Sequence, residues 1–227
     1  MLITLIDVET TGLSPNTAEV AEVGAILFDT EAVETLQQVS TLLPIKDNPA
    51  EYINGISPEL TRLIASDMQR EAILMIEVML YHSQYTMAYN SRFDKPFVER
   101  LLESKVELDW IDAMLLPWQH YKVQPSLVDL CLAYGVPVVS AHRALDDCRL
   151  LAALLGKLPN IDYAIAYALE PRVIIKALIG YDDRQLAKDE GFSFNRFVPN
   201  AWAKQVRRSE VEGLDLPFEF GVVETSI

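Results

Sequence analysis

The chain opens with a short and almost continuous run of apolar residues. Residues 2–8 read Leu-Ile-Thr-Leu-Ile-Asp-Val, and a run of this length predicts a central strand buried on both faces rather than a helix. Residues 18–28 and 33–43 predict two further strands, and the polar residues 29–31 between them predict a hairpin turn. The chain is therefore expected to begin as a three-stranded meander.

Helices and short strands are predicted to alternate after this meander. Turn and helix-start signals fill residues 47–65. The later pattern predicts a helix from a cap at Asp67 to about His82, a strand over 85–89, a helix over 93–103, a strand over 110–114, a helix from a cap at Ser126 to Gly135, and a helix from about 143 to 158.

The composition changes near residue 158. Residues 1–158 hold 11 basic and 22 acidic residues, whereas residues 159–227 hold 8 basic and 11 acidic residues. The second segment also gathers aromatic side chains within a short stretch, namely Phe192, Phe194, Phe197 and Trp202. We therefore expect a domain over 1–158 and a small C-terminal module over 159–227, with the boundary near Pro159.

The overall composition excludes several classes of protein. Half of the 227 residues are apolar and 23% are charged, which is typical of a globular core and excludes a disordered or fibrous chain. The net charge of −14 by itself argues against a protein that coats nucleic acid or an anionic membrane. Two cysteines exclude a disulfide scaffold. No signal peptide or apolar run of about 18 residues is present, so we expect a soluble cytoplasmic protein without a membrane partner.

Two carboxylates stand at the end of the predicted first strand. Asp7 and Glu9 are two residues apart, so their side chains point to the same face of a sheet. Acids on such an apolar strand need compensation, and the structural alternative is a turn cap beside a solvated strand end. The strand is followed by Thr10-Thr11-Gly12-Leu13, where a glycine leaves backbone amides able to approach a ligand.

Three more polar residues, Asp147, His142 and Asp94, lie where they could belong to a functional site. On a helix with 100° per residue, Asp147 lies at the margin of the apolar stripe, whereas Asp146 faces solvent. His142 shares a site with Asp147 only if it lies at or before the first turn, and the alternative is a surface or capping histidine. Asp94 follows a predicted strand-to-helix turn, where an acid alone favours the helix N-terminus.

These residues form three motifs that together resemble the DEDDh group of 3′–5′ exonucleases, typified by the proofreading subunit of bacterial DNA polymerase III. The motifs are Asp7-Val8-Glu9-Thr10-Thr11-Gly12-Leu13, Asn90-Ser91-Arg92-Phe93-Asp94 and His142-Arg143-Ala144-Leu145-Asp146-Asp147, and they occur in the family's order. The resemblance implies a ribonuclease H-like α/β fold, in which helices flank a five-stranded mixed sheet.

The resemblance also implies a chemistry with a physical reason. Phosphodiester hydrolysis gathers negative charge, which two divalent cations about 3.5–4 Å apart stabilise, and carboxylate oxygens suit Mg²⁺ or Mn²⁺. By resemblance, Asp7, Glu9 and Asp147 bind the metal that holds the attacking water, and Asp7 and Asp94 help to hold the second metal. His142 is implied as the general base, and the product is a nucleoside 5′-monophosphate.

Substrate contacts follow from the same resemblance. The residues implied to contact the terminal nucleotides are Thr10, Thr11, Leu13, Asn54, Asn90 and Phe93. Asn54 stands where the proofreading branch usually carries a histidine. Asp112 and Asp129 also lie where relatives often have acids, and we interpret both as structural, Asp129 as a helix cap.

The sequence thus predicts a metal-dependent enzyme that degrades DNA, preferably single-stranded, from its 3′ end. An RNA exonuclease similar to ribonuclease T or oligoribonuclease is the alternative, because sugar discrimination rests on contacts to the 2′-hydroxyl. A polymerase-associated proofreading subunit would need a protein partner. A catalytically inactive fold that serves as a binding module is disfavoured, because all four carboxylates and the histidine are present.

The C-terminal module has two interpretations. Residues 196–208 contain four basic residues and no acidic one, interleaved with aromatic residues. This pattern suits single-stranded nucleic acid, whose bases stack on aromatic rings. For most of the aromatics we favour the alternative, in which they form the small core of the module, which would then serve structure or partner binding.

Overall fold

The protein folds into two compact units, Met1–Ala168 and Leu169–Ile227, each described here by itself. The computed structural model describes residues 1–102, 107–120, 122, 125–140 and 142–223. The division falls later than the expected boundary near Pro159. The reason is helix α7, Ile161–Leu169, whose buried Ile161, Ala164 and Ile165 belong to the hydrophobic core of the first unit.

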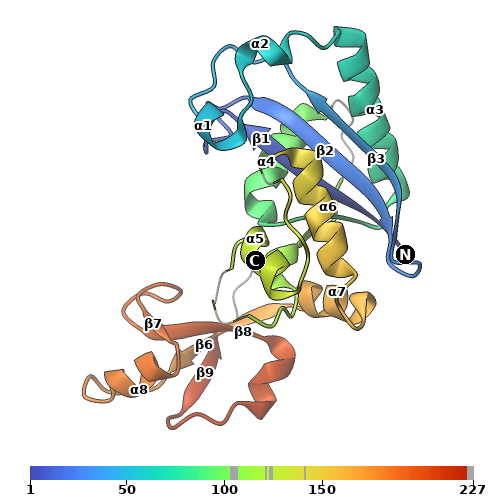
Figure 1. Cartoon of the computed structure of the whole chain (residues 1–227). Coiled ribbons are helices and arrows are strands. Elements are labelled where there is room, and N and C mark those ends of the chain that lie inside the picture. Colours follow the sequence, from blue (N-terminus) through green and yellow to red (C-terminus); the bar gives the residue numbers. More distant parts are fainter. Residues whose placement is uncertain (103–106, 121, 123–124, 141, 224–227) are drawn as a thin grey trace. The chain divides into compact units, whose positions relative to one another are not determined.

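A five-stranded mixed sheet forms the centre of the first unit (Figure 1). Its strand order is β3-β2-β1-β4-β5, with β1 over Leu2–Thr10, β2 over Val20–Asp29, β3 over Glu34–Leu42, β4 over Tyr85–Ala88 and β5 over Trp110–Asp112. Neighbouring strands among β1, β2 and β3 are antiparallel, while β4 runs parallel to β1 and to β5. The predicted meander and the mixed sheet are confirmed.

The helices that precede α7 in this unit are α1 over Glu51–Asn54, α2 over Pro58–Thr61, α3 over Ser66–His82, α4 over Ser91–Leu101, α5 over Leu127–Ala133 and α6 over Ala144–Leu155, with a 3₁₀ turn η1 over Ala113–Leu115. Among them, α3, α4 and α6 pack on the sheet, and α5 packs against α6. Ser126 caps α5 as predicted. The prediction for Asp67 is wrong, because the N-cap of α3 is Ala65, two residues earlier, and Asp67 lies within the first turn of the helix. Residue 103, the predicted end of the helix at α4, lies outside the described residues.

The alternation of β1 sorts its side chains between two cores. Ile3 and Leu5 pack in a cluster with residues of α6 and α7, whereas Ile6 packs with residues of α3 and α4 on the other face. Asp7 and Glu9 have the same parity as Ile3 and Leu5. The two carboxylates therefore point to the face of the sheet that α6 covers.

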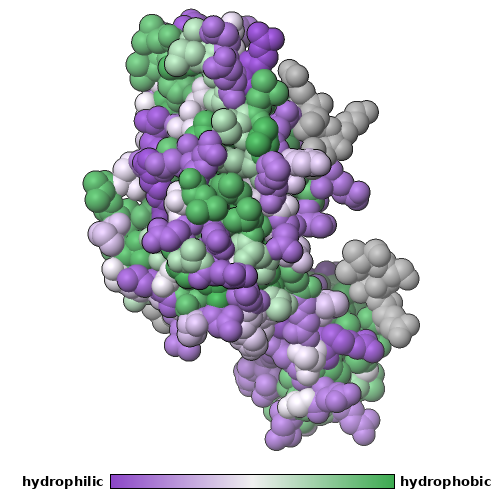
Figure 2. Space-filling view, turned by 90° about the vertical axis from the view of Figure 1, so that its right-hand side faces the viewer, coloured by the Kyte–Doolittle hydropathy of each residue, from purple (hydrophilic) through white to green (hydrophobic). Residues whose placement is uncertain are grey.

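The surface of the first unit mixes apolar and polar side chains. Figure 2 shows hydrophobic residues scattered among hydrophilic ones on the face turned to the viewer. On α3 alone, five large apolar side chains are exposed: Met68, Leu74, Met75, Val78 and Tyr81. No described helix combines the length and the hydropathy needed to cross a membrane. The two cysteines, Cys131 and Cys148, are buried free thiols.

The second unit is a four-stranded sheet of order β7-β8-β6-β9. Its elements are β6 over Arg172–Ala177, α8 over Arg184–Asp189, β7 over Ser193–Phe194, β8 over Trp202–Arg207, η2 over Arg208–Gly213 and β9 over Phe220–Val223. Phe192 is buried in the core, and Trp202 packs against it half-buried. Phe194 is 54% exposed and lies 5.6 Å from the Trp202 ring. The aromatic residues are therefore divided between the core and the surface.

Candidate active site

The site is built at the carboxyl end of β1. In the antiparallel pairing of β1 with β2, Asp7 lies opposite Gly24 and Glu9 lies opposite Glu22. Beyond Leu5, which pairs with Met87, β1 has no further paired residues on its β4 side. The end of β1 therefore extends past β4, and its edge is open to side chains from the helices.

Gly24 allows α6 to reach this position. A Cβ atom on Gly24 would lie 2.5 Å from the Leu145 backbone nitrogen and 2.7 Å from the Ala144 carbonyl carbon. Only glycine tolerates so close an approach of a helix to a strand. The first turn of α6 therefore lies directly on β2 beside Asp7, and it carries Asp147 to the carboxylates of β1.

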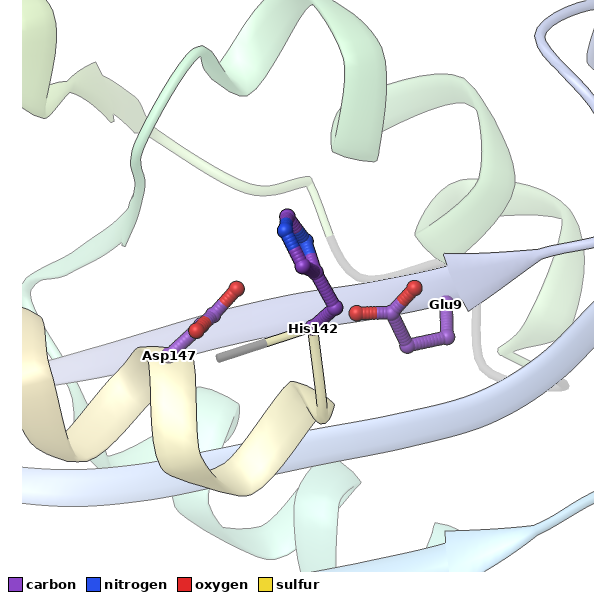
Figure 3. A group of neighbouring side chains, drawn as sticks. All are labelled: Glu9, His142 and Asp147. Atoms are coloured by element: carbon purple, nitrogen blue, oxygen red, sulfur yellow. The ribbon is translucent and has the colours of Figure 1, made fainter. Parts of the chain in front are cut away.

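His142 lies between Glu9 and Asp147 (Figure 3). It comes from the segment just before α6, whose N-cap is Arg143, so it precedes the helix as its expected pairing with Asp147 requires. One ligand atom from each of Glu9, His142 and Asp147 lies within 4.8 Å of the other two. Three predicted site residues, one from the first motif and two from the third, therefore meet at one point.

Asp94 reaches the same strand from the other side. It lies in the first turn of α4, is 2% exposed, and its Oδ1 accepts a hydrogen bond of 3.2 Å from the Val8 backbone N–H. Val8 is beyond the last paired residue of β1 on the β4 side, so the carboxylate takes the place of a missing strand partner. Asp94 is thereby held next to Asp7 and Glu9.

Burial and mutual repulsion shift the protonation of these acids. Burial raises the pKa of Asp7 well above its ordinary value, and the nearby charges of Asp94 and Asp147 raise it further. Burial, followed by the charge of Asp147, raises the pKa of Glu9 to about 7. Burial also raises the pKa of Asp94 to about 7, although the Val8 hydrogen bond opposes it. The cluster therefore concentrates more negative charge than its surroundings compensate.

These residues fit a divalent cation. Oδ1 of Asp147 is buried and has no hydrogen-bond partner among the described residues. An unpartnered buried carboxylate oxygen is costly, and a bound cation removes that cost. Carboxylate oxygens suit Mg²⁺ and Mn²⁺. The tightest donor group is Glu9, His142 and Asp147, in which His142 stands where the resemblance implies a general base.

The turn after β1 forms hydrogen bonds within the protein. Thr10 donates through Oγ1 to the Gly12 carbonyl at 2.7 Å. The Thr11 N–H donates to the Glu19 carbonyl at 2.9 Å, and Thr11 Oγ1 accepts from the Glu19 N–H at 2.9 Å. The Thr11 amide is therefore bonded within the protein, and the expected contact of this turn with a nucleotide stays a prediction. Leu13 is 86% exposed, as a side chain that contacts a ligand should be.

Asn54 is also engaged internally. It is buried, its Oδ1 accepts from Asn48 Nδ2 at 3.0 Å and from the Ile56 N–H at 3.1 Å, and its Nδ2 donates to the Thr10 carbonyl at 3.3 Å. A hydrogen bond from Asn54 also lowers the pKa of Glu9. Asn54 therefore ties its loop to the end of β1, which corrects the expectation that its side chain is directed to the substrate.

The second motif places its residues in different environments. Asn90 has a left-handed backbone with φ of 67°, its side chain is exposed, and its N–H donates to Asp112 Oδ1 at 3.1 Å. Phe93 is half-buried, with its ring 5.2 Å from that of Phe97. Asp112 also accepts the Met114 N–H. Asp129 forms the capping box with Ser126, so both acids are structural as predicted.

Sequence reasoning missed a residue that holds this site. Glu22 is 3% exposed, and its carboxylate accepts hydrogen bonds from the Arg143 guanidinium at 2.8 and 2.8 Å and from the Ala144 N–H at 3.1 Å. The signal was present, because an acid within an apolar strand needs a buried partner. The partner, however, lies 121 residues away in the sequence.

Two protein-family models match this chain. The model of the exonuclease family matches residues 4–155. A second family model, of a domain of unknown function, matches residues 173–220. The first match covers most of the first unit, and the second lies entirely within the second unit.

The chain is similar to two kinds of DNA polymerase III protein. The chain is 27% identical over 157 residues to the DNA polymerase III PolC-type of Thermotoga maritima, covering 65% of this chain and 11% of that protein. It is 28% identical over 166 residues to the DNA polymerase III subunit epsilon of Treponema pallidum, covering 66% of this chain and 73% of that protein. The chain thus spans only about a tenth of the PolC-type relatives.

Solved structures show the same fold. The complex of E. coli exonuclease I with single-stranded DNA superimposes with a TM-score of 0.59 at 18% identity, covering 78% of this chain and 48% of that chain. Exonuclease X in complex with 5′ overhanging duplex DNA superimposes with a TM-score of 0.53 at 22% identity, covering 73% of this chain and 99% of that chain.

Proposed function

Because the chain belongs to the exonuclease family, with the residue pattern of its DEDDh 3′–5′ members, we propose that it removes nucleotides from the 3′ end of single-stranded DNA. The observation that carries the proposal is the meeting of Glu9, His142 and Asp147 within 4.8 Å, beside Asp7 on the same strand. Stability of the fold does not require the acid of the first motif to lie beside the histidine and the acid of the third, so their convergence favours a catalytic role.

Asp7, Glu9, Asp94 and Asp147 would hold two divalent cations, Mg²⁺ or Mn²⁺. Bound cations would supply positive charge that stabilises the anionic transition state of phosphodiester hydrolysis. Four carboxylates carry about four negative charges, which two such cations balance. The raised pKa values of Glu9 and Asp94, each about 7, mean that these acids are only partly ionised near neutral pH until positive charge arrives.

His142 would act as the general base. Its imidazole is exposed to solvent and stands between Glu9 and Asp147, so it can take a proton from an attacking water. The water oxygen forms a bond to phosphorus, the bond from phosphorus to the 3′ oxygen breaks, and the 3′ oxygen gains a proton. The products are a nucleoside 5′-monophosphate and a strand shortened by one nucleotide.

Substrate contacts are proposed for the side chains that the structure leaves exposed beside the site. Leu13 would pack against the terminal base, and the exposed side chain of Asn90 would donate to the nucleotide. DNA is favoured over RNA because the curated relatives are DNA polymerase proteins. The same relatives support a polymerase as a protein partner, which would also deliver the 3′ end to a chain with a net charge of −14.

The test is a substrate comparison with the purified full chain. Matched single-stranded DNA, double-stranded DNA and RNA are incubated with Mg²⁺, Mn²⁺ or chelator, and released mononucleotides are measured. We expect metal-dependent release from the 3′ end, fastest with single-stranded DNA, and a loss of about 10²–10⁴-fold in His142→Ala. Full activity of His142→Ala would refute the general base, and faster release from RNA would refute the DNA preference.

For the second unit we propose binding of single-stranded nucleic acid as a supporting function. Arg196 and Arg208 are exposed, the ring of Phe194 is 54% exposed, and no acid interrupts residues 196–208. Cationic side chains beside an exposed ring suit phosphates and a stacked base. The matching family has no known function, so the proposal rests on these residues alone.

A further inference from the structure

Glu22 is a fifth carboxylate at the proposed active site, but it is bonded differently from the other four. Both of its oxygens are occupied: Oε1 accepts from Arg143, and Oε2 accepts from Arg143 Nε and from the Ala144 N–H. Asp147, by contrast, keeps a buried Oδ1 with no hydrogen-bond partner among the described residues. Glu22 is thus neutralised by protein groups, whereas Asp147 remains open to a ligand.

The groups that bond Glu22 follow directly on His142. Arg143 is the N-cap of α6 and Ala144 is its first residue, so Glu22 fixes the two residues through which the chain enters the helix. The Ala144 N–H is one of the helix's otherwise unsatisfied donors. The contact is bidentate and joins the exposed Arg143 side chain to the buried Glu22 carboxylate. Such a contact is directional, so it sets both the position and the orientation of this entry.

His142 needs such support, because its backbone is strained. Its φ is 63°, in the left-handed region that residues with a side chain rarely adopt. A strained residue persists only where its surroundings hold it. Gly24 lies on β2, two residues from Glu22, and its lack of a side chain lets α6 approach the strand closely. Glycine, however, has no side chain that could hold the helix in place.

We propose that Glu22 is a positioning residue: through Arg143 and Ala144 it holds His142 in its left-handed conformation between Glu9 and Asp147. The proposal rests on the proposed function for its kinetic consequences. It predicts that loss of Glu22 displaces His142 and α6 while the carboxylates on β1 and α4 keep their places. A displacement of about 1 Å in a reacting group costs about 100-fold in rate.

The variants are Glu22→Ala and Glu22→Gln, with Arg149→Ala as the control. Arg149 forms an ion pair of 2.9 Å with Asp146 on the solvent side of the same helix, so its loss removes an ion pair without touching the helix entry. We expect kcat to fall about 10–100-fold in Glu22→Ala, with KM changed less than about threefold. Glu22→Gln keeps an acceptor for the Ala144 N–H, so it should recover part of this loss. Arg149→Ala should match the unmodified protein.

A double-mutant cycle separates positioning from general stabilisation. If Glu22 acts through His142, then Glu22→Ala should cost less than about threefold in a His142→Ala background. Equal losses in both backgrounds, or an unchanged kcat in folded Glu22→Ala, would overturn the proposal. Should Glu22→Ala fail to fold, the cycle is run with Glu22→Gln and judged by the same two outcomes.

A readout without catalysis tests the same point. In the metal-free protein, the imidazole NMR signals of His142 should move in Glu22→Ala and stay in place in Arg149→Ala. Unmoved signals in folded Glu22→Ala would overturn the positioning role even if the rates changed. If the unmodified protein releases no nucleotides, the proposed function fails, while these signals still decide the placement of His142.

Discussion

The two units of this chain differ in whether they bury polar and charged side chains. All buried polar or charged residues among those that the structure describes lie in the first unit, and they include Glu22 and Asp94 at the proposed site. The described part of the second unit has an apolar core, with its charges at the surface. Because burying charge costs free energy, the difference indicates that the first unit holds the costly chemistry.

The two units also differ in how closely their glycines are packed. Gly24 lies where a Cβ would collide with the backbone of α6, whereas Gly213 in the second unit has no atom within 4 Å of its would-be Cβ. The first unit is therefore constrained around its site, and the second unit tolerates change at a comparable residue. Four experiments test this difference, from the largest expected effect to the smallest.

The largest effect is expected from Asp147→Asn. The substitution keeps the size of the side chain but removes the charge that faces Glu9, so nucleotide release should fall by at least about 10³-fold. Asp146→Asn is the matched control on the neighbouring position, where the carboxylate bonds Arg149 at 2.9 Å on the solvent side. Steady-state release of mononucleotides measures both. Equal losses in the two variants would show that the charge of α6 as a whole matters, not its orientation.

The next largest effect is expected from Gly24→Ala in the first unit, compared with Gly213→Ala in the second. The added methyl group must push α6 away from β2, which we expect to cost about 1–3 kcal/mol of unfolding free energy and at least about tenfold in kcat. Gly213→Ala should change the unfolding free energy by less than about 0.5 kcal/mol. Denaturant unfolding and nucleotide release give both values. A Gly24→Ala protein with normal activity would contradict the close packing of α6 on β2.

The acids of the proposed site and Glu170 of the second unit contribute to the pH dependence of stability with opposite signs. In the metal-free first unit, Glu9 and Asp94 have pKa values of about 7, above their values in an unfolded chain. The folded protein therefore binds more protons than the unfolded chain between about pH 4 and 7, and the stability contributed by these groups falls as the pH rises through that range. In the second unit, the Ser209 hydrogen bonds lower the pKa of Glu170, whose contribution is lost as the pH falls.

Thermal unfolding with chelator at pH 5.5 and at pH 8 measures this effect. The first unit should unfold at a lower temperature at pH 8, by about 2–4 °C for each kcal/mol lost. Mg²⁺ should restore more stability at pH 8 than at pH 5.5, because the carboxylates are then charged. Asp94→Asn should flatten the pH dependence. A first unit equally stable at both pH values would contradict the raised pKa values.

The smallest effect is expected in the second unit. The double variant Arg196→Glu with Arg208→Glu reverses two exposed charges, and it should raise KM for single-stranded DNA about 3–10-fold with kcat unchanged. Lys188→Glu is the control, because Lys188 is exposed on α8 outside the basic stretch. An unchanged KM and an unchanged salt dependence would leave the second unit a structural or partner-binding element.

Much of the site followed from local patterns. The two-residue spacing of Asp7 and Glu9 placed both on one face of a strand, and the helical phase of Asp147 placed it toward that strand. His142 precedes α6 as its spacing required. Thr11 and Asn54 were interpreted differently, because their bonds to Glu19, Asn48 and the end of β1 depend on how the loops fold back.

The sequence by itself determined the strands and the longer helices of residues 1–158, the parity of the carboxylates and the order of the three motifs. Only the tertiary structure decided that Glu22 holds the entry of α6, that Gly24 admits the helix, and that α7 belongs to the first unit. The physical reason is the distance along the sequence over which each interaction acts. Periodicity and capping act over a few residues, whereas the contact of Glu22 with Arg143 depends on strand register and helix packing together.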